Sequence, residues 1–303
     1  MKSDTLPKIL IDCSLSNIAD FLRCPLMGND IRINGFNLCN REIIADSVIS
    51  YCAAEKYLLI AIKNPKVKAI IVTQSVYDNA SELTKQHFSF IISETPEWSF
   101  YKAFIHLINI TTYPIYDWEV SLDEVTVGEG AIIERGVKLG KKVTVGSNSV
   151  VKSGSIIGDN VHIGSCSVIG GEGFQLIKDD EGKSHAIPHI GRTYIGNDVF
   201  IGDNTTIAKS LFEGYTYIDD SVKIDNHCHV AHNCIVGENS VLTACVTLFG
   251  SCIVGKNVWL APNSSVMNRV KVGDGAFVCA SSFVMRNVKP GDKVFGVPAN
   301  KID

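Results

Sequence analysis

The stretch that decides the fold is residues 218–242, IDDSVKIDNHCHVAHNCIVGENSVL. A bulky aliphatic residue returns at every sixth position, and the residues between are mostly polar or small. A period of six fits neither the 3.6-residue turn of a helix nor the two-residue alternation of a half-buried strand. It predicts a solenoid whose coils have short flat sides and a turn at each corner.

The same pattern runs through most of the second half of the chain, in 23 hexads with no polar residue at the aliphatic position. Three sides per coil make a rung of 18 residues, so we expect residue i to stack on residue i+18. We call the aliphatic positions the ladder. Its residues are Val127, Ile133, Leu139, Val145, Val151, Ile157, Ile163, Ile169, Ile195, Ile201, Ile207, Ile218, Ile224, Val230, Val236, Leu242, Leu248, Val254, Leu260, Val266, Val272, Val278 and Val284.

Composition and charge limit the function. The chain has 303 residues, enough for two domains, and a net charge of −4 with no basic stripe, which argues against nucleic acid as a partner. No apolar run reaches the roughly 18–20 residues that cross a bilayer. The start, MKSDTLPKIL, lacks the apolar core of a signal peptide, so a cytoplasmic protein without membrane contact is expected.

The ten cysteines form no CxxC pair, and several precede ladder residues by two positions, as Cys228, Cys234 and Cys252 do. At such positions cysteine is a compact apolar filler, so we expect these thiols to be reduced and buried. No permanently bound cofactor or metal is expected.

Residues 1–120 lack the six-residue period and read as a small α/β domain, followed by the solenoid over residues 121–303. Strands are expected at residues 8–12, 31–38, 47–52, 67–73 and 88–92. Helices are expected at residues 16–22, 53–63 and 96–109, the last with Thr95 as N-cap and Pro96 at its first position.

The period breaks at two places in the solenoid. Between Ile169 and Ile195 the spacing is 26 residues instead of 24, and the insert GGEGFQLIKDDEGKSHAIPHIGR is polar and rich in glycine. Between Ile207 and Ile218 the spacing is 11 instead of 12. A regular core has no need of such a loop, which indicates contact with a substrate or a neighbouring subunit.

Three histidines, His227, His229 and His232, fall in the stretch IDNHCHVAHNC. Stacking by 18 residues places Gly250 over His232, with Arg269 near the same place one coil further on. A glycine above an outward-facing imidazole leaves a backbone N–H and open space, the arrangement of a general base next to an oxyanion donor. His232 is therefore the candidate base and Gly250 the candidate donor.

The hexads resemble those of the left-handed β-helix acyltransferases, which are trimers. Nearly the whole chain is similar to the UDP-3-O-acylglucosamine N-acyltransferases of lipid A synthesis, in the stretches SVISYCAAEKY, KAIIVTQ, GGEGFQ, IPHIGRTYIGNDVFIGDNTTI and KIDNHCHVAHNCIVGENSVL. The resemblance implies a mainly β, left-handed parallel β-helix, a homotrimer, and the roles given above for His232 and the Gly250 N–H. It also implies that residues 1–120 bind a nucleotide-linked sugar through an aromatic pair, Tyr51 and Tyr57.

The chain departs from that family at three places. The family asparagine that reads uracil falls on Ala54, the second active-site histidine falls on Arg269, and the helical extension that helps hold an acyl carrier protein is absent. The ending FGVPANKI is similar instead to sugar acetyltransferases that use coenzyme A. We therefore expect transfer of an acetyl or short hydroxyacyl group from acyl-CoA to a nucleotide-linked amino sugar, for surface polysaccharide. The alternative is the lipid A enzyme with its acyl carrier protein.

The remaining site residues follow from their nearness in sequence. Asp225, Asn226 and His227, on the preceding hexad, are expected to position the sugar or orient the imidazole of His232. Arg269 is expected to contact donor phosphate as a fixed charge. The residues outside the ladder near His232 are mostly polar or small, which predicts no apolar groove for a long acyl chain.

Two other classes of protein stay open. His227 and His232 are five residues apart, the spacing of two zinc ligands in β-helix carbonic anhydrases, but the third ligand would fall near Gly191, with His189 close by. A solenoid that only binds a partner is the second alternative, and it leaves the histidine cluster and the insert unexplained.

Overall fold

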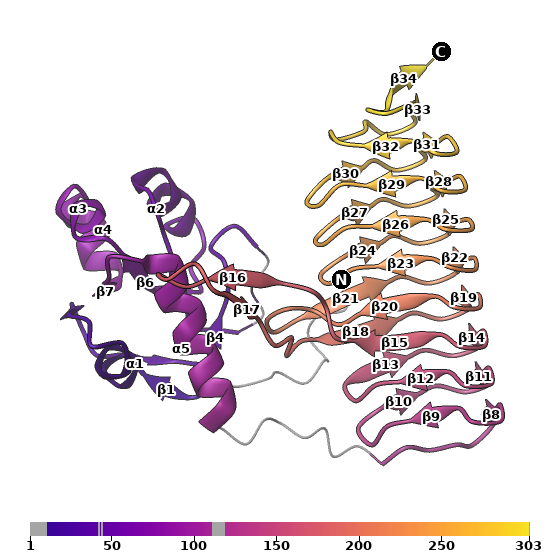
Figure 1. The fold of residues 1–303 in the computed structure, drawn as a ribbon, viewed down its shortest axis with the longest axis horizontal. Helices are drawn as coiled ribbons and strands as arrows, with labels where there is room; N and C mark the ends of the chain where they lie inside the picture. The colour runs from indigo at the N-terminus through magenta and orange to yellow at the C-terminus, as the bar shows by residue number, and fades with distance from the viewer. Residues whose placement is uncertain (1–10, 42, 44, 111–118, 303) are drawn as a thin grey trace. The chain divides into compact units, whose positions relative to one another are not determined.

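The computed structural model describes residues 11–41, 43, 45–110 and 119–302, and the chain divides into two compact units. Met1–Pro114 and Gln175–Pro188 form the first unit, and Ile115–Phe174 with His189–Asp303 form the second. Residues 175–188 come from the insert between two ladder residues, yet they belong to the first unit. Figure 1 shows this segment as the hairpin of β16 (Leu176–Lys178) and β17 (Ser184–Ala186).

The first unit is a small α/β domain, as expected. Its five-stranded sheet has the order β2-β7-β6-β5-β4 and is parallel except for the β2–β7 pair; β1 and β3 form a separate antiparallel pair. The elements are β1 (Cys13–Ser14), α1 (Leu15–Leu22), β2 (Leu26–Met27), β3 (Arg32–Ile33), β4 (Gly35–Phe36), β5 (Val48–Tyr51), α2 (Glu55–Ala61), β6 (Val67–Val72), α3 (Gln74–Asp78), α4 (Glu82–His87), β7 (Ser89–Ile92) and α5 (Pro96–Ile110).

The three helices expected from the sequence form as α1, α2 and α5, and α5 begins at Pro96. The short helices α3 and α4 are not predicted from the sequence. Their N-caps are Thr73 and Ser81, whose hydroxyls accept the N–H groups of Val76 and Thr84. The expected strand at residues 31–38 is divided into β3 and β4, and the one at residues 8–12 lies largely outside the described residues.

The second unit is the predicted solenoid, with three parallel sheets along its sides (Figure 1). The eight-stranded sheet contains β9 (Ile132–Ile133), β12 (Val150–Val151), β15 (Val168–Gly171), β20 (Thr206–Ala208), β23 (His229–Val230), β26 (Thr247–Leu248), β29 (Ser265–Val266) and β32 (Phe283–Val284). The seven-stranded sheet contains β10 (Lys138–Leu139), β13 (Ser155–Ile157), β18 (Arg192–Ile195), β21 (Tyr215–Ile218), β24 (Ile235–Val236), β27 (Ile253–Val254) and β30 (Lys271–Val272). The ten-stranded sheet contains β8 (Thr126–Val127), β11 (Thr144–Val145), β14 (His162–Ile163), β19 (Phe200–Ile201), β22 (Lys223–Ile224), β25 (Val241–Leu242), β28 (Trp259–Leu260), β31 (Phe277–Val278), β33 (Lys293–Phe295) and β34 (Asn300–Ile302), the last pairing antiparallel with β33.

The register confirms the 18-residue rung: Val230 pairs with Leu248, and Leu248 with Val266. The ladder is buried from Val145 to Val284 and forms one continuous core. Two-residue strands are stable here because each lies between two neighbours that satisfy its backbone groups. Residues that precede the ladder by two positions are buried as expected, among them Cys228, Cys234 and Cys252.

The corners explain the asparagines that recur three residues after the ladder. These residues take the left-handed backbone conformation, with φ of 60° at Asn233 and 59° at Asn239. Asparagine tolerates this conformation better than most residues. His227 and Arg269 also stand three residues after a ladder residue, with φ of 59° and 63°.

No helix within the described part of the chain is long and apolar enough to cross a membrane.

Candidate active site

His232 lies at the corner between the eight-stranded and the seven-stranded sheets. The equivalent corners of successive coils stack on one another along this edge of the solenoid. The insert between β15 and β18, residues 172–191, leaves the solenoid at this corner. The short spacing between Ile207 and Ile218 falls there too, in the loop between β20 and β21. Both breaks in the period thus meet at the corner that carries His232.

The His232 side chain is buried, since only 8% of the residue is exposed. This corrects the expectation of an outward-facing imidazole. Its Nδ1 lies 2.9 Å from the side-chain oxygen of Asn233. The same oxygen accepts the N–H of Leu211 at 3.1 Å, and the Asn233 amide nitrogen donates to the Ser210 hydroxyl at 2.5 Å.

These contacts assign the proton of the imidazole. The Asn233 oxygen is an acceptor, so Nδ1 of a neutral His232 must be its donor. Nε2 is then the unprotonated nitrogen, and an unprotonated ring nitrogen is the atom that a general base uses. The asparagine is itself fixed, because its backbone N–H donates to the Thr216 hydroxyl at 2.8 Å.

Gly250 lies against the other edge of the ring. A Cβ atom at Gly250 would stand 2.7 Å from Nε2 of His232, closer than side chains pack. Gly250 therefore stacks on His232, as the 18-residue rung predicts. The space above the glycine, however, is occupied by the imidazole itself and is not the open gap that the sequence suggested. Only glycine allows Nε2 this close to the backbone.

The Gly250 N–H lies outside a hydrogen-bond pattern that repeats at the other two corners of the coil. Two positions after the ladder, six backbone N–H groups donate to an aspartate or asparagine side chain at the same position one coil on. Among the described residues the Gly250 N–H makes no such bond, although Asn268 stands one coil on. The six donors are Lys141, Asp159, Ser165, Asn197, Asp203 and Lys256.

A backbone N–H that the scaffold does not use is available to a ligand. Near the lone pair of Nε2, it is suited to stabilise the negative oxygen that forms when a carbonyl is attacked. The corner therefore joins a base of fixed tautomer to a candidate oxyanion donor, within one chain.

The insert contributes a second histidine that the sequence analysis considered only as a zinc ligand. His189 is 2% exposed, and its ring meets that of His232 edge to face, with 5.1 Å between the ring centroids. Its Nδ1 lies 3.8 Å from the carboxylate of Glu172, which also accepts the His189 backbone N–H at 3.3 Å. Lys209 pairs with the other oxygen of that carboxylate at 3.2 Å.

The loop between β20 and β21 supports the same corner. Gly191 packs against the backbone of Phe212 and the side chain of Ser210, where a Cβ atom would clash. The buried guanidinium of Arg192 lies over the ring of Tyr215, 4.5 Å from its centroid. The short loop thereby holds Ser210, which in turn holds Asn233.

Three residues expected near His232 lie elsewhere. Asp225, Asn226 and His227 occupy the preceding corner, between β22 and β23, and all three are exposed. Asn226 accepts the N–H of Asp203 at 2.7 Å, and Asp225 accepts the N–H of Asn226 at 2.7 Å. A hexad is one side of the coil, so a shift of six residues moves a side chain to a different corner. Within one chain they therefore do not orient the imidazole.

His229 is also separate from His232, because it lies on the outer face of β23. Its Nδ1 is 2.7 Å from the Thr206 hydroxyl, and burial lowers the pKa of its imidazole. Among the described residues, no group of three or more His, Cys, Asp or Glu side chains is arranged to hold a metal ion. The zinc alternative thus has no ligand set in the described parts of one chain.

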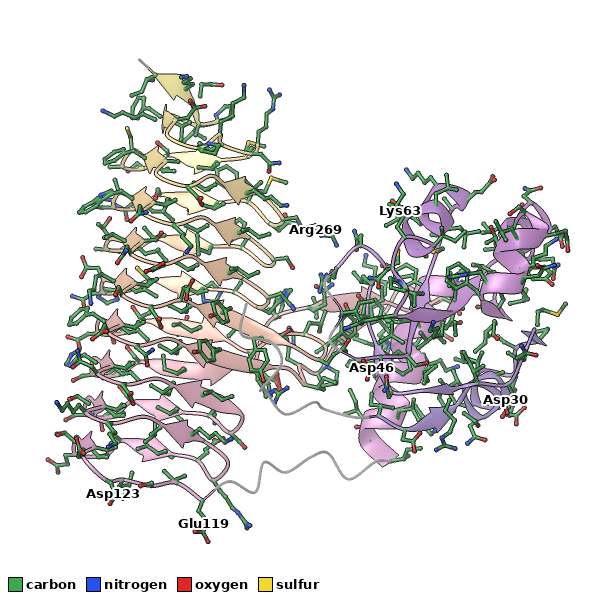
Figure 2. The ribbon with its side chains drawn as sticks, turned by 180° about the vertical axis from the view of Figure 1, so that it is seen from behind. Asp30, Asp46, Lys63, Glu119, Asp123 and Arg269 are labelled. Carbon is green, nitrogen blue, oxygen red and sulfur yellow. The ribbon has the colours of Figure 1, made fainter. Side chains whose placement is uncertain are left out.

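Arg269 lies at the same corner as His232, one coil beyond Gly250. Its backbone N–H donates to the Gly250 carbonyl at 3.1 Å, and its side chain is exposed, as Figure 2 shows at the edge of the coils. The Arg269 guanidinium thus provides a positive charge near this corner. Its contact with donor phosphate stays a prediction.

The corner also carries apolar side chains that the sequence analysis overlooked. Phe249, Met267 and Met285 follow the ladder directly on three successive coils, and Phe249 and Met285 are 40% and 44% exposed. The Phe249 ring packs edge to face against Phe283, with centroids 6.1 Å apart. The expectation that mostly polar or small residues near His232 leave no apolar surface for an acyl chain overlooked these side chains.

The first unit contains the predicted aromatic pair. Tyr51 ends β5, and its hydroxyl donates to the carboxylate of Glu97 at 2.6 Å. Tyr57 lies in α2, 37% exposed, with Lys56 over its ring. Ala54 is the N-cap of α2 and makes no side-chain capping bond. Binding of a nucleotide by these residues stays a prediction.

Comparison with known proteins supports the resemblance. Residues 136–171, 215–250 and 251–286 match the family described as bacterial transferase hexapeptide (six repeats). UDP-3-O-acylglucosamine N-acyltransferase of Dechloromonas aromatica is 50% identical over 84 residues, 27% of this chain and 23% of that protein. The enzyme of the same name from Thermosynechococcus vestitus is 45% identical over 83 residues, 27% of this chain and 24% of that protein. The chain thus spans about a quarter of the length of these curated relatives.

Among solved structures, the UDP-N-acetylglucosamine acyltransferase from Campylobacter jejuni aligns with a TM-score of 0.53 at 23% identity, over 61% of this chain and 71% of that one. This likeness concerns the fold. It confirms the fold, a left-handed parallel β-helix that contains hexapeptide repeats and follows a small α/β unit in the sequence.

Proposed function

We propose that this hexapeptide-repeat protein is an N-acyltransferase that acylates the amine of a nucleotide-linked amino sugar. The observation that carries the proposal is the fixed tautomer of His232. The side-chain oxygen of Asn233 accepts a hydrogen bond from Nδ1–H, and Nε2 faces the backbone of Gly250, whose N–H makes no hydrogen bond among the described residues. This arrangement suits attack by an amine on a thioester.

The proposed reaction uses each of these groups once. The amine nitrogen attacks the thioester carbonyl carbon while Nε2 of His232 takes a proton from it. The carbonyl oxygen becomes negative and accepts the Gly250 N–H. The carbon–sulfur bond then breaks, an amide remains, and the imidazolium returns its proton to the leaving thiolate.

For the acceptor, the names of the relatives favour UDP-3-O-acylglucosamine. We therefore propose this class of substrate, which was the alternative reading of the sequence. Tyr51 and Tyr57 are the residues proposed to contact the nucleotide.

For the donor, the apolar residues at the His232 corner favour an acyl chain of more than a few carbons. Phe249, Met267 and Met285 continue along the coils from Gly250 and offer apolar surface to such a chain. Transfer of a short group from acyl-CoA is the second candidate. The exposed Arg269 at the same corner favours it, since a guanidinium binds phosphate well.

A donor and acceptor panel tests both candidates. UDP-3-O-hydroxyacylglucosamine and other nucleotide amino sugars are offered with acetyl-CoA, hydroxybutyryl-CoA or a hydroxymyristoyl carrier protein, and kcat/KM is measured from thiol release. We expect the long carrier-bound donor with the UDP-3-O-acylated acceptor to give the highest kcat/KM. A preference for acetyl-CoA would restore the short-chain candidate, and no transfer with any pair would contradict the proposed function.

We also propose a homotrimer. Phe200, Trp259 and Phe277 lie on the outer face of the ten-stranded sheet and are 42%, 44% and 36% exposed. Exposed aromatic groups on a flat face indicate a protein interface. Light scattering is expected to give about three times the chain mass of 33.0 kDa. A fully active monomer would contradict this proposal.

A further inference from the structure

The insert places a buried imidazole against the candidate base. The side chain of His189 has no exposed surface, and its ring meets the ring of His232 at an interplanar angle of 62°. Edge-to-face contact is the favoured geometry for two flat rings, because it brings the positive edge of one to the negative face of the other. His189 therefore occupies one side of the space in which His232 can turn.

His189 has contacts on two sides of its ring. The carboxylate of Glu172 receives its backbone N–H and lies beside Nδ1, and Lys209 fixes that carboxylate. On the other side, Nε2 of His189 lies so close to Gly173 that a Cβ atom there would clash with the ring. Gly173 does not require the left-handed region, so the ring contact accounts for glycine at this position.

Two glycines thus enclose two imidazoles, with Gly173 against His189 and Gly250 against His232. We propose that His189 is a positioning residue, which holds the ring of His232 so that Nε2 faces the acyl carbonyl at Gly250. This inference rests on the proposed function. The bond from Nδ1 to Asn233 fixes one atom of the ring, and contact with His189 fixes the plane.

The insert has a second consequence in this arrangement. The same 20-residue excursion that supplies Glu172, Gly173 and His189 also supplies the hairpin β16–β17 to the first unit, where His185 packs on Trp98 with ring centroids 4.9 Å apart. The support of the base is therefore on the chain segment that leaves the solenoid, and not in the regular coils.

Kinetics test the positioning role with three variants. His189→Ala is expected to lower kcat about 10- to 100-fold with little change in KM for the amino sugar, because a base turned out of line slows the chemical step. His189→Phe keeps a flat ring and is expected to recover activity to within about threefold of wild type. Gly173→Ala, which forces His189 aside, is expected to lower kcat as His189→Ala does. The matched control is His87→Ala, which removes an exposed ring that meets Phe88 edge to face in the first unit and should leave kcat unchanged.

A spectroscopic measurement separates this inference from the proposed function. In protein labelled with ¹⁵N-histidine, the ring nitrogens of His232 are expected to report a single tautomer with the proton on Nδ1, and His189→Ala is expected to give a mixture. His189→Phe is expected to keep the single tautomer. Unchanged spectra and unchanged kcat in His189→Ala would overturn the positioning role, whatever reaction the protein catalyses. Absence of transfer by wild-type protein, with the tautomer shift present, would instead contradict only the proposed function.

Discussion

Replacing His232 with alanine is expected to lower kcat by about 10²–10⁴-fold, the usual contribution of a general base. The physical reason is that Nε2, with its lone pair facing Gly250, is the acceptor placed to take the amine proton. The measurement is kcat for acyl transfer at saturating donor and acceptor. A variant that keeps more than about a third of wild-type turnover would show that His232 is not the base.

The stability of this variant is a separate expectation. The sequence suggested that an outward-facing histidine could be removed without effect on folding, but His232 is buried and bonded to Asn233. Its loss is therefore expected to cost about 1–2 kcal/mol of unfolding free energy, since it leaves a gap and a buried acceptor without its donor. Thermal unfolding of His232→Ala against His87→Ala, an exposed histidine in the first unit, measures the difference. If kcat of His232→Ala falls by more than its loss of folded protein can explain, the remaining loss is catalytic.

Replacing Gly250 with alanine is expected to lower kcat about 100-fold, the loss that a displacement of about 1 Å can cause at a catalytic group. The added Cβ atom would stand 2.7 Å from Nε2 of His232, so either the imidazole or the backbone must move. Gly250 does not have a positive φ, so alanine fits its backbone without strain. The fall in kcat is therefore expected to exceed any loss of folded protein, which thermal unfolding measures.

The control for this variant is Ala244→Ser. Ala244 stands two positions after the ladder, as Gly250 does, but at another corner of the coil. A comparable loss of activity in Ala244→Ser would mean that any change at this corner position disturbs the coils. Activity of Gly250→Ala within about threefold of wild type would contradict the arrangement proposed for the base and the oxyanion donor.

The short helices of the first unit show where local sequence signals are too weak. Helix α5, of 15 residues, begins at a proline and was expected almost to the residue. Helices α3 and α4, of five and six residues, have only a capping hydroxyl each to mark them. Such short helices depend on packing against the sheet more than on their own propensity.

The ladder and the stacking of His232 on Gly250 were determined by the sequence alone. A six-residue period is a local property repeated 23 times, and any other register would expose apolar residues on every coil. The six-residue period also separates residues 225–227 from His232 by one side of the coil. The prediction that these residues lie beside His232 was therefore wrong although the sequence contained the information to avoid it.

Only the tertiary structure decided what surrounds the base. The insert has no period, so nothing in its sequence states that His189 returns to meet the ring of His232, or that Glu172 holds it. The burial of His232 and the assignment of its proton depend on Ser210 and Leu211, which come from the second break in the repeat. Repeated contacts between adjacent coils can be counted from a sequence, whereas contacts made once, between loops of different length, arise only when the folded chain brings those loops to the same corner.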